Sequence, residues 1–88
     1  MMFLNSTWIT FVQSFRNHWQ ECPFQEKLTR ELNGLEDVAV VIYGLVGSSA
    51  LKWIKEPVPA LENHRPVDCC MKRSLIKKLK SMLMKMPC

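Results

Sequence analysis

The sequence lacks most of the patterns by which small enzymes and metal proteins are recognised. It has no G-x-G-x-x-G, no P-loop and no H-E-x-x-H motif, so it offers neither a phosphate cradle nor a zinc-protease helix. Histidine is scarce: only His18 and His64 occur, and neither has a Cys, Ser or carboxylate at motif spacing. We therefore expect no enzyme, no catalytic residue, no cofactor and no bound metal.

Cysteine patterns of the usual kinds are also missing. The four cysteines, Cys22, Cys69, Cys70 and Cys88, form neither a C-x-x-C pair nor a Cys/His cluster at zinc spacing. The first ten residues, MMFLNSTWIT, lack the basic region and small-residue cleavage site of a secretion signal. We therefore expect reduced thiols in a cytoplasmic protein, with two of them filling core positions. No apolar run approaches the roughly 20 residues of a membrane span, so no membrane partner is expected.

The length and charge set further limits. A chain of 88 residues is one small domain with a marginal core. Because 48% of its residues are hydrophobic, we expect a second copy or a partner to cover part of its apolar surface. The net charge is +4, and residues 71–88 contain basic groups but no acidic residue. The basic side chains of this tail are Lys72, Arg73, Lys77, Lys78, Lys80 and Lys85.

Residues 1–34 read as an N-terminal helical segment. A first helix is predicted from Ser6 or Thr7 to Glu21, with Asn5, Ser6 or Thr7 as its N-cap. Its apolar residues share one face: Leu4, Trp8, Phe11, Val12, Phe15 and Trp19. This face favours a core or homodimer contact over a partner-binding or membrane-surface helix. A second helix, Gln25 to Leu32, is predicted to be closed by Gly34 in the left-handed C′ position.

The central segment poses a choice between helix and strand. A helix is predicted to begin at Leu35 or Glu36, although the β-branched residues 38–43 favour a strand by propensity. We predict a helix because no strand partner exists and helical patterns flank the segment. Gly44 and Gly47 are predicted to bracket a tight break. A serine after Gly47 then caps a helix over residues 50–55, which carries Trp53.

The C-terminal part begins with a proline-rich corner. Pro57 and Pro59 stop the preceding helix, Leu61 returns toward the core, and Pro66 is suited to the first position of a short helix over 67–70. A last helix is predicted from about Arg73 to Met86. Its apolar residues lie on one arc: Leu75, Ile76, Leu79, Met82, Leu83 and Met86. Such a basic amphipathic helix suits a membrane surface, a nucleic acid or a calmodulin-like partner, but we favour core packing with solvated lysines.

The corner carries a resemblance to a known family. The run W-I-x-x-P-x-x-A-L-x-x-x-x-P-V-D, from Trp53 to Asp68, resembles the toxin-binding domain of MbcA/ParS/Xre-type antitoxins. The matching positions are Trp53, Pro57, Ala60, Leu61, Pro66 and Asp68. The resemblance extends over roughly residues 35–86 and assigns 35–88 to an antitoxin-like domain. Two family glycines are replaced at Glu62 and Asn63, and the glycine that begins the family's last helix is Leu75 here.

The resemblance implies both fold and function. It leads us to expect an all-α domain of about five helices, packed around Trp53 and the apolar face of the last helix. The implied function is neutralisation of a RES-domain toxin, which acts on NAD, by protein–protein occlusion. The residues expected to face this partner are Asn63, His64, Arg65, Lys77, Lys78 and Lys85. A homo-oligomer is also expected. The family's DNA-binding helices have no counterpart in residues 1–34, so operator binding by this chain alone is not expected.

Two alternatives stay open. The first is a small basic nucleic-acid-binding module that uses the lysines of the last helix, with binding that weakens steeply as salt rises. The second is a divergent protein with a structural role only.

Overall fold

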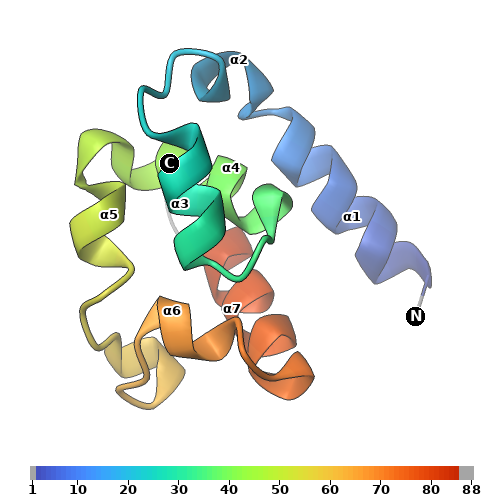
Figure 1. Cartoon of the computed structure of the whole chain (residues 1–88). Coiled ribbons are helices and arrows are strands. Elements are labelled where there is room, and N and C mark those ends of the chain that lie inside the picture. Colours follow the sequence, from blue (N-terminus) through green and yellow to red (C-terminus); the bar gives the residue numbers. More distant parts are fainter. Residues whose placement is uncertain (1, 86–88) are drawn as a thin grey trace.

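Helix α4 (Glu36–Val46) lies at the centre of the molecule, and α1, α2, α3, α5 and α7 all pack against it (Figure 1). The computed structural model describes residues 2–85, with the side chains of residues 7–85. The β-branched run of α4, Val38 to Ile42, is 0% exposed at every position. A helix that is apolar all round must be buried on all sides. The prediction of a helix rather than a strand is confirmed.

The described residues form α-helices and short 3-10 turns and contain no strand. Their bounds are α1 (Met2–Gln13), α2 (Arg16–Trp19), α3 (Gln25–Glu31), α4 (Glu36–Val46), η1 (Gly47–Ser49), α5 (Ala50–Trp53), η2 (Pro59–Leu61), α6 (Pro66–Cys69) and α7 (Arg73–Lys85). The all-α prediction is confirmed. Four α-helices have seven residues or more, and the others are single turns.

The N-terminal helix differs from its prediction. The chain is already helical at Met2, so Asn5, Ser6 and Thr7 lie inside α1 and cannot be its N-cap. The predicted single helix is also interrupted between Gln13 and Arg16, where α2 begins. At the break the Ser14 hydroxyl donates to the carbonyl of Phe11 at 2.6 Å. A serine that bonds its own helix backbone in this way competes with the helical ladder.

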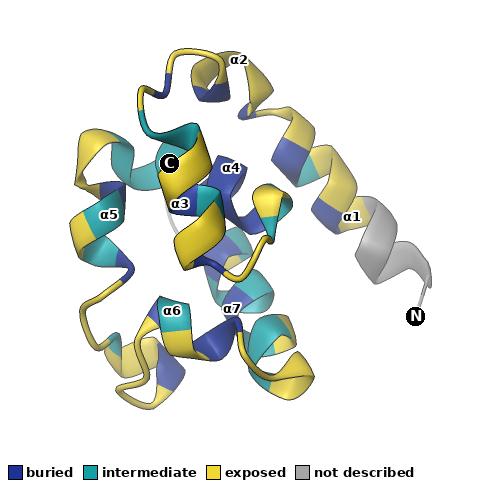
Figure 2. Cartoon of the chain, viewed as in Figure 1, coloured by how far each residue is buried: buried dark blue, intermediate teal, exposed yellow. Residues whose placement is uncertain are grey.

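The apolar face of α1 and α2 is part of the core. Trp8, Val12, Phe15 and Trp19 are all buried within the single chain, and the interpretation of this stripe as core is confirmed (Figure 2). The side chain of Leu4, also assigned to this face, lies outside the described part. The face is fixed by a polar contact as well, because the Trp8 indole N–H donates to Asp37 Oδ2 at 2.8 Å.

The two central glycines have different roles. Gly44 does not break the chain as predicted, since it lies inside α4. A Cβ at this position would lie 2.2 Å from Cδ1 of Phe15, so glycine is what allows α4 to meet the aromatic face. The break occurs at Gly47, whose φ of 62° favours glycine. Ser49 then stands at the N-cap position of α5 without a side-chain cap hydrogen bond.

The end of α3 follows a Schellman pattern. Asn33, with φ of 60°, takes the C′ position that was predicted for Gly34, and Gly34 follows with φ of 81°. The amide of Gly34 donates to the carbonyl of Thr29 at 2.9 Å, which satisfies an orphan helix carbonyl. Asparagine tolerates the left-handed region better than most residues, so it can replace glycine here.

The core was predicted to be centred on Trp53, and this prediction is wrong. Trp53 is half-buried, whereas its neighbour Ile54 is 0% exposed. The centre is α4, to which α7 contributes buried Leu79 and Leu83. Two cysteines were predicted to fill core positions, and the structure buries three as free thiols: Cys22, Cys69 and Cys70. Cys88 and Met86 lie outside the described residues.

No single helix within residues 2–85 is long and apolar enough to cross a membrane. Helix α3 and the helical segment Glu36–Trp53, which comprises α4, η1 and α5, meet the length and hydropathy requirement only when taken together. The bend between them is 115°.

Candidate functional site: the corner and the adjoining helix

The proline-rich corner is a tight loop closed by its own backbone. The amide of Val58 donates to the carbonyl of His64 at 3.1 Å, and the amide of Asn63 donates back to Val58 at 3.0 Å. The amide of Leu61 also donates to the Val58 carbonyl, at 2.9 Å. These bonds form an isolated antiparallel bridge between Val58 and His64. The loop therefore keeps one shape although most of its side chains are exposed.

The corner is anchored at its entry and exit. The amide of Val67, in α6, donates to the carbonyl of Ile54 at the end of α5, with a length of 3.1 Å. Leu61 is 0% exposed and fixes the middle of the loop in the core. Pro66 is buried and occupies the start of α6, as predicted. Figure 1 shows the resulting sharp reversal between α5 and α6.

The other residues of the Trp53–Asp68 pattern lie nearer the surface. Trp53 is half-buried, and Pro57, Ala60 and Asp68 are exposed. Asp68 is used locally: its carboxylate accepts two hydrogen bonds from Arg65, at 2.9 and 3.1 Å. This pair stands across the first turn of α6 and holds the side chain of Arg65 against the helix.

The tip of the corner has an uncommon backbone. Glu62 and Asn63 are consecutive residues with φ of 56° and 65°, both in the left-handed region. Glycine reaches this region freely, whereas other L-residues lose about 1–2 kcal/mol there. These two positions are the ones at which the resembled antitoxin family has glycines. The backbone at 62–63 thus has a conformation that glycine would adopt without steric cost.

An ion pair joins the corner to α7. Lys78 Nζ lies 2.7 Å from Glu62 Oε1, and this contact is the main reason that the pKa of Glu62 lies below its usual value. The hydrogen bonds from Arg65 likewise lower the pKa of Asp68. Both carboxylates are exposed, so the pairs are individually weak and act mainly to position their partners.

The structure places the six residues expected to face a partner in two groups. Asn63, His64 and Arg65 are exposed along the loop, and the ion pair to Glu62 brings half-buried Lys78 beside them. Lys85 is exposed on the same side of α7, about 20° from Lys78 and about 10 Å along the axis by helical geometry. Lys77 is also exposed, but it points about 100° away from Lys78.

Two participants were missed by sequence reasoning. Glu62 was regarded only as a replaced glycine, yet it connects the loop to α7. Asp68 was assigned a structural role without a partner, although its spacing of three residues from Arg65 is a recognisable helical ion-pair spacing. No comparable signal in the sequence connects Glu62 with Lys78, because they meet only through the fold.

Possible metal ligands and the buried thiols are the remaining reactive groups. Within the described part of the chain, no three His, Cys, Asp or Glu residues come together as metal ligands. Burial raises the pKa of the Cys69 thiol and raises the pKa of the Cys70 thiol to about 12. These thiols are therefore protonated and poor nucleophiles at neutral pH.

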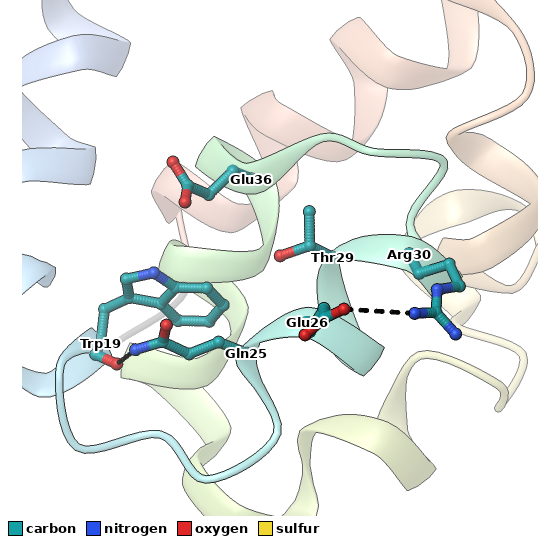
Figure 3. A pocket seen from close by; sticks show the side chains of 6 residues that line it. All are labelled: Trp19, Gln25, Glu26, Thr29, Arg30 and Glu36. Carbon is teal, nitrogen blue, oxygen red and sulfur yellow. Dashed lines mark hydrogen bonds and ion pairs between the residues drawn. The ribbon is translucent and has the colours of Figure 1, made fainter.

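A surface hollow lies between α2, α3 and the start of α4 (Figure 3). Its volume is about 480 Å³, and it is lined by Trp19, Gln25, Glu26, Thr29, Arg30 and Glu36. Its polar groups are already engaged: Gln25 donates to the Trp19 carbonyl, and Arg30 pairs with Glu26. Glu36 pairs with Arg16 at 3.3 Å. The charged groups that line the hollow are therefore compensated by ion pairs.

No family model, curated protein or solved structure matches this chain. The functional interpretation therefore depends on the Trp53–Asp68 pattern and on the geometry of the corner.

Proposed function

We propose that the chain is a cytoplasmic antitoxin-like protein that binds a RES-domain toxin, which acts on NAD, and occludes it. The contact surface is formed by residues 62–65 of the corner together with Lys78 and Lys85 of α7. The action is stoichiometric contact and involves no catalysis by this chain. The antitoxin role comes from the resemblance of residues 53–68, and the local geometry supports it.

The observation that carries this proposal is the left-handed backbone of Glu62 and Asn63. In the resembled family this place is occupied by two glycines, and a glycine pair is typical where the backbone requires positive φ. Non-glycine residues in this conformation are uncommon and concentrate where a specific shape has a function. The loop thus has a backbone shape that glycines at these two positions would adopt without steric cost.

The corner is suited to docking because it is already rigid. Its three bonds to Val58 and His64 fix the backbone before any partner arrives, so little conformational entropy is lost on binding. Arg65 and Lys78 are matched by Asp68 and Glu62, so the corner presents compensated charge. Specificity would come from the shape of the loop and from the exposed side chains of Asn63 and His64.

Co-expression with a RES-domain toxin tests the proposal. We expect the chain to co-purify with the toxin and to relieve its growth arrest. The two histidines supply matched variants, because both are exposed but His18 lies on α2, on another side of the molecule from the corner (Figure 1). His64→Trp should abolish co-purification and rescue by adding bulk to the docking surface, while His18→Trp should preserve both. Absence of binding by the unmodified chain would refute the proposal, and equal effects of both variants would exclude the corner as the contact.

A further inference from the structure

The basic side chains of α7 divide into two sets with different surroundings. Lys78 and Lys80, on the flanks of the helix, are each matched by an acid from a neighbouring element. Lys78 pairs with Glu62 at 2.7 Å, and Lys80 Nζ lies 3.4 Å from Asp37 Oδ2. Lys80 also lies 5.2 Å from the centre of the Trp8 ring, which adds a cation–π contact. These two lysines therefore have structural partners.

The outer set forms a row along the helix. Arg73, Lys77, Ser81 and Lys85 follow one another at four-residue intervals, which places them on one ridge with steps of about 6 Å and a length of about 18 Å. Arg73, Lys77 and Lys85 are exposed. None of the three has an ion-pair partner among residues 7–85, and residues 71–88 contain no acidic side chain. The row therefore keeps its full positive charge.

An apolar groove runs beside this row. It lies between α1 and α7, is lined by Thr7, Thr10, Phe11 and Met84, and has a volume of about 480 Å³ bounded mostly by apolar atoms. Met84 points only about 20° away from Lys77 around the axis of α7. Phe11 and Met84 are both half-buried, so each still presents apolar surface to the groove. Positive charge and apolar surface are thus adjacent along one side of α7.

We propose that the groove and the row together bind an acidic amphipathic helix of a partner protein. An amphipathic helix recognises a groove by placing its apolar face inside and its polar face along the rim. Here the apolar face would cover Phe11 and Met84, and glutamates or aspartates on one edge would meet Lys77 and Lys85. This surface does not include the corner loop, although it shares Lys85 with the toxin contact proposed above. The inference holds whichever protein supplies the helix.

The same features disfavour a nucleic acid as the ligand of this surface. The exposed row contains no aromatic side chain on which an unpaired base could stack. A phosphate backbone would satisfy the three cations, but it has no apolar group to fill the space between Phe11 and Met84. Glutamates spaced four residues apart on a helix match the step of about 6 Å between neighbours in the row.

Fluorescence anisotropy with synthetic helices tests this inference. The probe is a labelled amphipathic peptide of about 14 residues, with leucine on one face and glutamate elsewhere; the matched peptide carries lysine in place of glutamate. At about 0.15 M salt the acidic peptide should bind and the basic peptide should not. Lys77→Glu/Lys85→Glu should weaken binding by about tenfold or more, because two charge contacts become repulsive. Met84→Gln should weaken binding about three- to tenfold by making the groove polar.

The controls change the same chemistry elsewhere on the surface. Lys27→Glu/Lys52→Glu changes the net charge by the same amount, at exposed lysines of α3 and α5 that have no ion pair within the described chain. Ile9→Gln alters a side chain of α1 that is 54% exposed outside the groove. Both should bind the acidic peptide as the unmodified chain does, and circular dichroism should show equal helix content in all variants. Failure of the acidic peptide to bind would overturn the inference. Binding of duplex DNA that is as tight as that of the acidic peptide, and that Met84→Gln does not change, would also contradict it. Equal losses in Lys27→Glu/Lys52→Glu and in Lys77→Glu/Lys85→Glu would also overturn it, since net charge alone would then explain binding.

Discussion

The aromatic face of α1 and α2 and the corner at 54–68 are built on opposite principles. The aromatic face is held by side chains: Phe11 meets Phe15 edge-on with ring centres 5.1 Å apart, and Trp19 meets Tyr43 of α4 at 6.3 Å. The corner is held by backbone hydrogen bonds and leaves most of its side chains in solvent. The first region stabilises the domain, and the second keeps a fixed shape that a partner can bind. Substitutions in the two regions should therefore have effects that differ in kind and in size.

The largest effect is expected from the buried tryptophan of the aromatic face. Trp19→Ala should lower the free energy of unfolding by about 3–5 kcal/mol, since Trp19 is only 5% exposed and its removal leaves a cavity. Trp53→Ala should cost clearly less, because Trp53 is half-buried at the edge of the core. Urea denaturation of both variants measures the difference. Equal losses would mean that the corner tryptophan is as central as the resemblance first suggested.

The close contact between Gly44 and Phe15 should give the next largest effect. Gly44→Ala forces a methyl group into space occupied by the Phe15 ring, and overpacking of this kind costs about 1–3 kcal/mol. The intrinsic helix preference for alanine over glycine opposes this loss by about 1 kcal/mol. In a Phe15→Leu background the alanine should be tolerated better. A double-mutant cycle measures this coupling, and additive effects would show that the two residues do not meet.

A smaller effect is expected at the tip of the corner. Glu62→Ala and Glu62→Gly both remove the carboxylate that pairs with Lys78, but only glycine relieves the left-handed backbone. The glycine variant should therefore be more stable than the alanine variant by about 1 kcal/mol. The comparison cancels the loss of the ion pair, which makes it a direct measure of the backbone at residue 62. Identical denaturation midpoints with equal slopes would contradict a positive φ there.

The smallest expected effect is the pH dependence of the stability that the Glu62–Lys78 ion pair contributes. Lys78 lowers the pKa of Glu62 from its ordinary 4.5, so the folded state favours the charged carboxylate. This contribution to stability is present above the unfolded pKa and is lost as the pH falls through the lower folded pKa. An NMR titration should show the pKa of Glu62 returning toward 4.5 in Lys78→Ala. Arg65→Ala leaves the Glu62–Lys78 pair in place and should not produce this return, which makes it the control.

Much of the fold could be predicted from the sequence because hydrophobic periodicity and the residues that begin or end helices act locally. The spacing of Trp8, Val12, Phe15 and Trp19 identified a buried face, and Pro66 identified the start of a short helix. The break at Ser14 was not predicted, because a serine inside an apolar helical pattern can either face solvent or bond its own helix backbone, as Ser14 does with the carbonyl of Phe11. Propensity alone would have placed a strand in the buried segment of α4, where packing on all sides decides instead.

The candidate site was predictable only in part. The exposed positions of Asn63, His64 and Arg65 follow from a polar turn before Pro66. The pairing of Glu62 with Lys78 is long-range, and a sequence gives no distance between a loop and a later helix. For the same reason the charge pattern of α7 revealed many lysines but could not distinguish the paired Lys78 and Lys80 from the unpaired outer row.

The most direct test of the central claim is the rate of NAD consumption by a purified RES-domain toxin as this chain is titrated into the reaction. Occlusion predicts that the rate falls to a plateau at a fixed molar ratio and that His18→Trp inhibits as well as the unmodified chain. His64→Trp should leave the rate high over the same range. An NAD consumption rate that stays constant with excess unmodified chain, under conditions in which the chain is folded, would contradict the antitoxin role.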